Sequence, residues 1–390
     1  MKKKRLCFIF DSKPSEKDGA SLRVYHEYIK FFVDDSFEVT IVYFAKKNEQ
    51  QLKFDFKKNV NVIPLPKETH LLPNRFKLIN DLNEQITIEG ILRKFKIQCV
   101  VAFDIVAISQ LTNATKIPKI GWLGDLRYLT NKFNFFFSVK ENLMNIKSFF
   151  YNFVQNILIR KFYQIHLKKL DKIIVSSSSS VRELSKLNFE SSFLPYPWPE
   201  KFSKRDLTIN IPTFLFFGNL SGLGSRSSII ELIKEIYPKM KKKFGDNKFK
   251  ILIGGINFKN SYLNKIDLNQ FPELKFIGYI KNLEKIASQC NAFIFPGKVP
   301  IGNRCRLLTC LASEVLIIVS ESVTFGNNYL KNKYNSLIAK NTNEFIDHMF
   351  FSFYNPETCK VIKKNGKQTY LNNYFPKIAI RKFKEEILKI

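Results

Sequence analysis

The stretch NAFIFPGKVPIGNRCRLLTCLASEVLIIVS, residues 291–320, contains two apolar runs with a helical pattern between them. The runs Ala292–Phe295 and Val315–Val319 show no alternation of polar and apolar residues, which is typical of strands buried on both faces of a parallel sheet. Between them, apolar residues recur at the spacing of one helix face: Leu307, Leu308, Leu311 and Ala312. The stretch therefore predicts a strand–loop–helix–strand unit of a parallel α/β sheet.

The loop before the predicted helix carries a glycine, an amide and several cations: Lys298, Gly302, Asn303, Arg304 and Arg306. At a helix N-terminus the backbone N–H groups and the helix dipole attract anions, and guanidinium groups bind phosphate in a bidentate manner. We therefore predict a phosphate site here. The same pattern also fits an ordinary connecting loop, since basic residues are abundant throughout the chain.

Strand and helix patterns alternate through the first half of the chain. Strands are predicted at Leu6–Phe10, Phe37–Phe44, Val60–Pro64, Cys99–Phe103, Ile117–Leu123 and Lys172–Val175. Helical patterns cover residues 22–33 and 86–95, and the serines at 176–180 are placed to cap a further helix. This order predicts a doubly wound parallel sheet.

The alternation restarts after the proline-rich segment Leu194–Phe202. Further strands are predicted at Thr213–Phe217, Lys250–Gly254 and Leu274–Gly278, a helix from about Ser227 to Lys243, and a helix interrupted at Pro376 over Tyr370–Ile390. The expected fold class is α/β, with two Rossmann-like doubly wound domains facing a cleft. We assign residues 1–205 to an N-terminal domain, 206–370 to a C-terminal domain, and 371–390 to a final helix that packs back on the N-terminal domain.

The composition describes a folded and strongly basic chain. Its 390 residues allow more than one core, and 63 Lys and Arg against 34 Asp and Glu give a net charge of +29. Such a surplus points to an anionic partner, although part of it also fits the Lys-, Asn-, Phe- and Ile-rich product of an AT-rich genome. We expect no nucleic acid, because the basic residues are spread along the chain without an aromatic–basic RNA motif.

Neither secretion nor membrane insertion is predicted. The first apolar run ends at Asp11, which is too early for a signal peptide, and no segment approaches the roughly 18 apolar residues that span a bilayer. The six cysteines include no CxxC pair and the four histidines are scattered, so no metal site is indicated. The segment GLGSRS at 222–227 lacks the third glycine of a dinucleotide fingerprint. We expect a cytoplasmic protein without a metal or cofactor.

The segment Lys140–Leu170 is predicted to form one or two long helices, and it carries an apolar stripe beside basic residues. The stripe comprises Phe149, Phe150, Phe153, Val154, Ile157 and Leu158. Two interpretations stay open: a helix that dips into an anionic membrane face, or a helix packed on the sheet with its cations in solvent. We favour the second for the helix itself, and we keep peripheral membrane association as an expectation that the net charge also supports.

Several segments, in their order and spacing, resemble the GT-B glycosyltransferases, with the closest likeness to the nucleotide-sugar-dependent group 1, family 4 type. They are DGASLRVYHEYIKFF, FEVTIVYF, KIIVSSSSSVREL, FFGNL, KFIGYIKNLEKIASQCNAFIFP, IGNRCRLLTCLASEVLIIVS and YNSLIA. The likeness covers nearly the whole chain. It implies a nucleotide-diphosphate sugar bound mainly by the second domain and an acceptor bound mainly by the first.

The resemblance also implies roles for individual residues. Gly19 and Arg23 stand near the phosphate-contacting loop of the first domain, Gly218 and Asn219 in the GN segment of the second, and Arg226 near the basic residue that binds the diphosphate. With the cation-rich loop at 298–306, these residues form the expected substrate-binding set.

Two features depart from the family pattern. The family carries a Glu-x7-Glu pair, with one carboxylate on the sugar and one on the ribose, and Thr309 and Ile301 stand at those two places. Both carboxylates are therefore absent. The family often has a histidine after the fourth strand of the first domain, and Asp104 stands about there.

We therefore expect a glycosyltransferase of the hexosyltransferase type, which moves a sugar from a nucleotide-diphosphate donor to a lipid-linked or cell-envelope glycan. Arg226 and Arg304, with Arg306, would offset the charge of the leaving diphosphate without a metal. Asp104 or Asp125 would orient or deprotonate the acceptor hydroxyl, although each also fits a solvated loop carboxylate.

Two alternatives stay open on the same fold. One is a catalytically impaired protein that binds a glycan or an anion, which is consistent with the missing carboxylates. The other is a nucleotide-sugar 2-epimerase, which would convert its donor without any acceptor.

Overall fold

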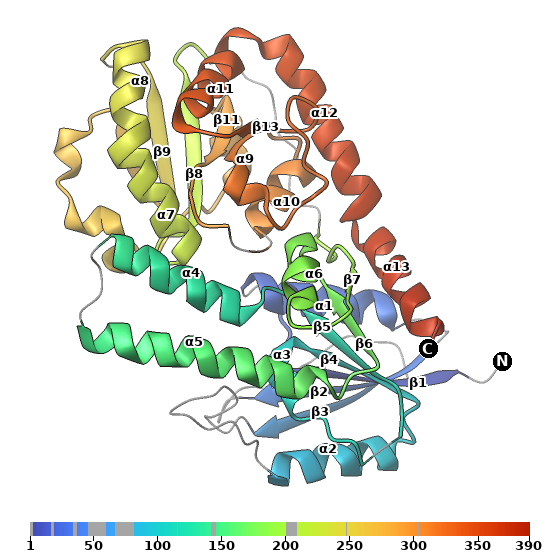
Figure 1. Cartoon of the computed structure of the whole chain (residues 1–390). Coiled ribbons are helices and arrows are strands. Elements are labelled where there is room, and N and C mark those ends of the chain that lie inside the picture. The colour runs from blue at the N-terminus through green and yellow to red at the C-terminus, as the bar shows by residue number, and fades with distance from the viewer. Residues whose placement is uncertain are drawn as a thin grey trace. The chain divides into compact units, whose positions relative to one another are not determined.

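The computed structural model describes residues 3–16, 19–33, 37–45, 60–66, 82–114, 116–141, 146–199, 209–246, 248–300, 302 and 304–390. The chain divides into two compact units (Figure 1). The first unit comprises Met1–Pro197 together with Pro376–Ile390, and the second comprises Trp198–Phe375.

The first unit is built on a parallel sheet of seven strands in the order β3-β2-β1-β4-β5-β6-β7. The strands are β1 (Lys4–Phe10), β2 (Phe37–Ala45), β3 (Val60–Pro66), β4 (Cys99–Phe103), β5 (Lys119–Leu123), β6 (Lys172–Val175) and β7 (Ser192–Phe193). From β1 the chain builds outward to β2 and β3, and it then returns to place β4 on the other side of β1. The direction of winding therefore reverses between β1 and β4.

Seven helices accompany this sheet in the described part of the unit: α1 (Ala20–Phe32), α2 (Leu82–Lys94), α3 (Asp104–Ser109), α4 (Arg127–Lys140), α5 (Ile146–Leu167), α6 (Ser178–Ser185) and α13 (Pro376–Leu388). β4 and β5 are buried along their whole length, as expected for central strands of a covered sheet. α13 joins this core through Phe383, whose ring lies 4.8 Å from that of Tyr28 and 5.8 Å from that of Phe32. The last helix therefore belongs to the hydrophobic core of the first unit.

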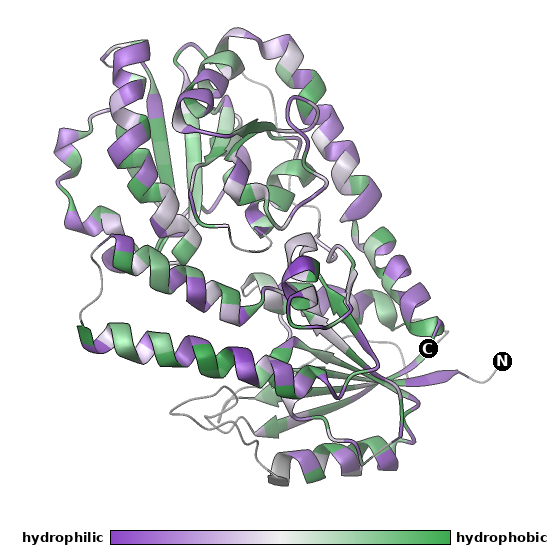
Figure 2. Cartoon of the chain, in the orientation of Figure 1, coloured by the Kyte–Doolittle hydropathy of each residue, from purple (hydrophilic) through white to green (hydrophobic). Residues whose placement is uncertain are grey.

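The second unit has a parallel sheet of six strands in the order β10-β9-β8-β11-β12-β13. The strands are β8 (Thr213–Asn219), β9 (Lys250–Ile256), β10 (Leu274–Gly278), β11 (Ala292–Phe295), β12 (Ile317–Ser320) and β13 (Leu337–Ala339). The helices are α7 (Leu223–Glu231), α8 (Tyr237–Phe244), α9 (Leu283–Ala287), α10 (Cys305–Ala312), α11 (Thr342–Tyr354) and α12 (Pro356–Asn373), and a π-helical turn over Leu232–Ile236 joins α7 to α8. In Figure 2 the strands of both sheets are mostly hydrophobic, whereas α8 and α12 alternate between hydrophilic and hydrophobic residues. The predicted α/β class with two parallel sheets is confirmed.

Some local predictions were wrong. The serines before α6 do not cap it: Ser177 is the N-cap residue, but its hydroxyl group pairs with that of Ser179 at 2.8 Å. The helix expected from Ser227 begins four residues earlier, at Leu223. Its N-cap residue is Gly222, whose backbone is extended. The helices α3, α4, α9 and α11 and most of α12 were not predicted.

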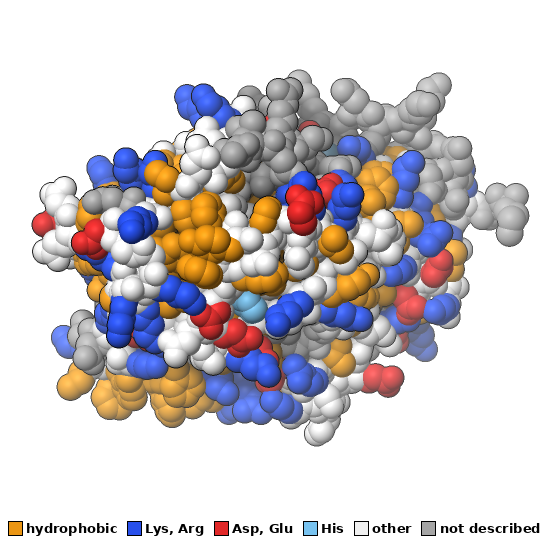
Figure 3. All heavy atoms as spheres, turned by 90° about the horizontal axis from the view of Figure 1, so that it is seen from above, with side chains coloured by type: hydrophobic (Ala, Val, Ile, Leu, Met, Phe, Trp, Pro, Cys, Tyr) orange, Lys and Arg blue, Asp and Glu red, His pale blue; other side chains and the backbone are white. Residues whose placement is uncertain are grey.

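The apolar stripe of α5 is largely exposed. Phe150 is 62% and Phe153 50% exposed, so the interpretation of the stripe as a helix face packed on the sheet is wrong for this half of α5. Only the later residues Ile159, Phe162, Tyr163 and Leu167 enter the core. No helix among the described residues is long and apolar enough to cross a membrane. On the face in Figure 3, Lys and Arg side chains are spread among acidic and hydrophobic ones instead of forming one patch.

Candidate functional site

The winding of the second sheet reverses between β8 and β11. β8 connects through α7 and α8 to β9 on one side, whereas β11 lies on the other side of β8. In open parallel sheets, ligands bind outside the carboxyl ends of the strands at such a reversal point. The segments that follow these two strands, residues 220–222 and 296–298, therefore mark the candidate site.

The carboxyl ends of β8 and β9 approach so closely that both require glycine. A Cβ atom at Gly255 would lie 2.0 Å from the carbonyl oxygen of Gly218, and one at Gly218 would lie 2.6 Å from a guanidinium nitrogen of Arg306. Both glycines have a positive φ, 147° at Gly218 and 154° at Gly255, which other residues rarely adopt. These two strand ends, which we call the rim, therefore have no room for a side chain at either position.

Helix α7 begins at this rim. Its N-cap residue is Gly222, no side chain caps it, and the Gly222 N–H donates to the carbonyl of Asn219 at 3.2 Å. The Asn219 side-chain oxygen accepts from the Ser221 N–H at 3.2 Å and from the Asn257 amide at 3.0 Å, which fixes the turn between strand and helix. An uncapped helix N-terminus beside a glycine rim is an arrangement suited to a diphosphate.

Two serines of α7 hold the loop that follows β11. The Ser228 hydroxyl donates to the carbonyls of Pro296 and of Gly224, and the Ser227 hydroxyl accepts from the Lys298 N–H at 3.2 Å. The Lys298 ammonium group pairs with Glu235, and this bond holds the pKa of Glu235 below its usual range. The predicted ligand Lys298 is thus engaged with a carboxylate of its own unit.

The predicted residues Arg304 and Arg306 pack against the start of α7 and the end of β8. Arg304 is only 6% exposed, donates to the carbonyl of Val299 at 3.1 Å and lies against Gly224 of α7. Arg306 donates to the carbonyl of Phe217, and its guanidinium group lies over the rings of Phe216 and Phe295 at 5.3 and 5.4 Å. Burial lowers the pKa of Arg306 to about 10. Both side chains brace the end of β8 and the start of α7.

Arg226 lies in the first turn of α7 and is half-buried. Its backbone N–H donates to the carbonyl of Gly222 at 2.9 Å, and partial burial lowers the pKa of its guanidinium group. Of the predicted cations, Arg226 thus belongs to the first turn of α7, whereas Arg304 is the N-cap residue of α10 and Arg306 lies in the first turn of α10.

Thr309 of α10 is hydrogen-bonded to the indole ring of Trp198. Its hydroxyl group accepts from Trp198 Nε1 at 3.1 Å and donates to the carbonyl of Cys305 at 3.3 Å. The backbone of Trp198 is itself fixed, because its backbone N–H donates to the carbonyl of Tyr374 and its backbone carbonyl accepts from the Tyr370 hydroxyl. Trp198 was not predicted from the sequence. The only sign of a role for it was its position within the proline-rich segment before the second sheet.

A second cluster lies in the first unit, at the reversal point between β1 and β4. Phe10 and Phe103 are register partners at the ends of these strands, so the residues that follow them, Asp11 and Asp104, emerge at the same edge. Arg127 donates to Asp11 Oδ2 at 2.8 Å and to Asp104 Oδ2 at 3.2 Å. Asp104 has a φ of +72°, a strained conformation that is common at functional sites. The structure thus joins the predicted Asp104 to two residues that were not predicted.

The pairing of Asp11 with Asp104 could have been found from the sequence. Both directly follow apolar runs that read as neighbouring strands of a doubly wound sheet, and strand order alone places them together. Arg127 gives no such signal, because only the tertiary structure brings the start of α4 to this edge. The buried Tyr25 also lies near the cluster: burial, Asp11 and Asp104 raise the pKa of its hydroxyl group, which keeps it protonated.

The other predicted residues lie elsewhere. Asp125 is exposed after β5, Gly19 is the N-cap residue of α1, and the Arg23 side chain donates to the carbonyl of Glu16 at 2.9 Å. Gly302 is half-buried, whereas Asn303 and Ile301 lie outside the described residues. Among the residues that the structure describes, no three His, Cys, Asp or Glu side chains gather as metal ligands.

Comparison with known proteins agrees with this architecture. Residues 211–350 match the family model described as "Glycosyl transferases group 1". Sucrose-phosphate synthase of Thermosynechococcus elongatus is similar in structure, with a TM-score of 0.69 and 12% identity over 99% of each chain. No curated protein matches the chain.

Two further structures are similar over their whole length. Anabaena HepE in complex with UDP has a TM-score of 0.67 and 10% identity, and covers 99% of this chain and 100% of its own. The lipopolysaccharide outer core galactosyltransferase WaaB, in its apo form, has a TM-score of 0.65 and 12% identity over 99% of each chain. At these identities the likeness shows the fold, and the fold predicted from the sequence is confirmed.

Proposed function

We propose that this chain, a glycosyltransferase with the GT-B fold, moves a hexose from a nucleotide-diphosphate sugar to a lipid-linked or cell-envelope glycan. The observation that carries the proposal is the uncapped start of α7, which follows the glycine-bearing strand end at Gly218. This rim lies within the segment that matches the group 1 glycosyltransferases. The complex of Anabaena HepE with UDP supports a nucleotide-sugar donor.

On the donor side, the chain's own groups supply positive charge for the diphosphate. The N-terminal N–H groups of α7 lie at the carboxyl edge of the sheet, and Arg226 belongs to the same first turn, so both would bind the phosphates directly. Arg304 and Arg306 pack against the start of α7 and the end of β8 and would act through space, because partly buried charges are weakly screened. Fixed positive charge of this kind stabilises the leaving diphosphate as negative charge develops on it. No metal is needed for that role.

On the acceptor side, Asp104 is the best placed of the predicted carboxylates. Its oxygen Oδ1 accepts from the Ile105 N–H at 2.6 Å, and its oxygen Oδ2 pairs with Arg127, so the side chain is held in one orientation. A carboxylate fixed at a reversal point can accept a hydrogen bond from a sugar hydroxyl and orient it. Asp125 is exposed and follows β5, away from the reversal point between β1 and β4, so it is the weaker candidate.

A second candidate function is donor binding without transfer. It is favoured by the bond between Thr309 and Trp198, because the hydroxyl group at the family's carboxylate position is already engaged by the indole. A site without either carboxylate holds the sugar more weakly while it still holds the diphosphate.

The test is a panel of UDP-, GDP- and CMP-sugars with the purified chain, in two steps. Thermal shift identifies the nucleotide, and product analysis then follows the sugar with and without a lipid-linked glycan acceptor, each with and without a chelator. Transfer that needs the acceptor and withstands the chelator supports the proposal. Binding without turnover identifies the second candidate, and conversion of the donor without an acceptor identifies a 2-epimerase. Absence of binding to every nucleotide sugar contradicts both binding candidates.

We also propose that the chain works in the cytoplasm, on the inner face of the cell membrane. The net charge of +29 supports attraction to an anionic surface, and the exposed aromatic residues of α5 supply apolar contact.

A further inference from the structure

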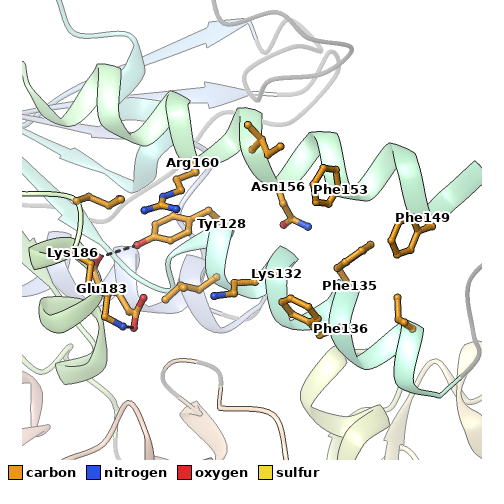
Figure 4. A pocket seen from close by; sticks show the side chains of 14 residues that line it. Tyr128, Lys132, Phe135, Phe136, Phe149, Phe153, Asn156, Arg160, Glu183 and Lys186 are labelled. Carbon is orange, nitrogen blue, oxygen red and sulfur yellow. Dashed lines mark hydrogen bonds and ion pairs between the residues drawn. The ribbon is translucent and has the colours of Figure 1, made fainter.

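A cavity of about 750 Å³ lies in the first unit between α4 and α5, with α6 at one end (Figure 4). We call it the α4–α5 cavity. Its volume falls within the range of small-molecule sites, and most of its lining is apolar. None of its lining residues belongs to the donor site or to the cluster around Arg127 and Asp104, so the cavity has no role in the chemistry described above.

The two ends of the cavity differ in polarity. The rings of Phe135, Phe136, Phe149 and Phe153 gather at one end, and Figure 4 shows them pointing between the two helices. The ring centroids of Phe135 and Phe149 lie 5.0 Å apart, so α4 and α5 are in direct aromatic contact there. The amide of Asn156 lies beside Phe153 (Figure 4), and the four rings otherwise make this end apolar, which suits a hydrocarbon.

The other end carries cations. Lys132, Arg160 and Lys186 line it together with Tyr128 and Glu183 (Figure 4). Glu183 pairs with Lys186 at 2.5 Å, whereas no ion pair joins Lys132 or Arg160 to a carboxylate within the part of the chain that the structure describes. Two cations without a carboxylate partner beside an apolar chamber are complementary to an anion that carries a hydrocarbon chain.

The surface around the cavity continues the same character. Ile146 and Tyr151 of α5, which do not line the cavity, are 77% and 51% exposed. The segment from Arg127 to Leu167 contains six Lys and Arg residues and one Glu. A contiguous apolar area with a cationic border is unusual for a free surface and is typical of contact with anionic lipid.

We propose that the α4–α5 cavity binds a phosphorylated lipid, with the hydrocarbon chain among the phenylalanine rings and the phosphate group at Lys132 and Arg160. This assignment rests on the proposed function, because it identifies the lipid that carries the acceptor glycan. A peptide fits the cavity less well. Apart from the amide of Asn156, the rings of the apolar end provide no partners for peptide N–H and C=O groups, and leaving such groups unpaired costs free energy that a hydrocarbon chain does not lose.

The test measures binding of dodecyl phosphate to the full chain by calorimetry, with dodecanol and inorganic phosphate as reference probes. Arg160→Ala and Phe153→Ser change the two ends of the cavity. Lys161→Ala and Phe150→Ser are matched controls, because both residues are exposed on the same helix but do not line the cavity. We expect dodecyl phosphate to bind more tightly than either reference probe. Its affinity should fall about tenfold or more in the two cavity variants and stay unchanged in the controls.

Three results would overturn the proposal. Equal losses in cavity and control variants would mean that only the general surface of α5 attracts lipid. If inorganic phosphate bound as tightly as dodecyl phosphate, the hydrocarbon chain of the probe would lie outside the cavity. If dodecyl phosphate did not bind at all, the site would be excluded. Transfer from a nucleotide sugar to a water-soluble glycan is measured in parallel. If that transfer occurs and dodecyl phosphate does not bind, the lipid inference alone fails. If dodecyl phosphate binds and no nucleotide sugar does, the acceptor role fails together with the proposed function.

Discussion

Three arginines of the second unit have the same charge but different surroundings. Arg304 and Arg306 donate to the backbone carbonyls of Val299 and Phe217, so they stabilise the loop and strand ends that form the rim. Arg226 belongs to the first turn of α7 and is half-buried. Replacing each arginine should therefore change a different property of the protein.

We expect Arg226→Ala to weaken nucleoside-diphosphate binding about tenfold or more, because a charge-assisted contact to phosphate is lost. Arg226→Lys should retain part of the affinity, since an ammonium group keeps the charge but lacks the planar, bidentate donor geometry of a guanidinium group. Calorimetric titration with UDP and with uridine makes the measurement, and Lys242→Ala on the exposed surface of α8 is the control. An equal loss for uridine and UDP would show that Arg226 does not contact the phosphates. Arg304→Ala should chiefly lower the melting temperature, because it removes a buried side chain.

Thr309 allows the missing carboxylate to be restored. Thr309→Glu would place a larger, charged side chain where the Thr309 hydroxyl group now accepts from Trp198 Nε1. The present hydrogen bond of the buried indole N–H would be lost. We expect no gain in turnover and a lower melting temperature, since a lost buried hydrogen bond costs about 1–3 kcal/mol. Thr309→Val separates the two effects, because it removes the hydroxyl group without adding charge. A large gain in turnover with Thr309→Glu would contradict the cation-based mechanism.

At the scale of elements, the two halves of α5 have different surroundings. Its first half exposes the phenylalanines of the stripe, and its second half enters the core of the first unit. His166 lies in this buried half, 3% exposed, with its ring 4.3 Å from that of Phe162. Neither ring nitrogen has a hydrogen-bond partner among the described residues. Burial first, and the nearby Lys169 second, lower the pKa of His166 from 6.5 to about 4.

This depressed pKa makes the stability of the first unit depend on pH. Above pH 6.5 the ring is neutral in the folded and unfolded chains, so its contribution is fully present. As the pH falls from 6.5 towards 4, the unfolded chain binds a proton that the folded chain does not, so stability is lost. His166→Leu should remove this part of the slope. Urea unfolding of both proteins across that range makes the comparison, and a constant difference between the two curves would show that His166 does not titrate this way.

The same element scale shows why some features could be predicted from the sequence. Buried parallel strands are continuous apolar runs, so β1, β4, β8 and β11 were recognised from local pattern alone. Helix α4 was missed because its aromatic residues serve the α4–α5 cavity as well as the core, which blurs the helical period. α13 was recognised through Pro376, since proline cannot continue the preceding helix.

At the scale of the whole molecule, residues that act together come from distant parts of the chain. Asp104 and Arg226 were predicted because the resemblance to the GT-B glycosyltransferases assigns functional residues to their places in the sequence. Trp198 and Arg127 were missed because their partners, Thr309 and Asp11, are more than 100 positions away in the sequence. Loop residues can be assigned to a strand end from sequence, but the contacts that engage Lys298 and Arg304 depend on packing that no local pattern contains.

The division into two units leads to a prediction about unfolding. Each unit has its own sheet and its own core, and the start of α7 with Arg226, Arg304 and Arg306 belongs to the second unit. A nucleotide sugar at about 100 times its dissociation constant should stabilise its site by about 2.7 kcal/mol. For a unit of this size that corresponds to a rise of roughly 5–10 °C in the melting temperature. Scanning calorimetry should therefore show one transition that rises with donor and one that does not.

The transitions can be assigned with two probes of the first unit. His166→Leu should change only the transition of the first unit when the pH is lowered, and dodecyl phosphate should raise that same transition. The donor should raise the other one. If the donor instead raised both transitions together, its binding would not be confined to the second unit, and the assignment of the diphosphate site to the rim of β8 and β9 alone would be wrong.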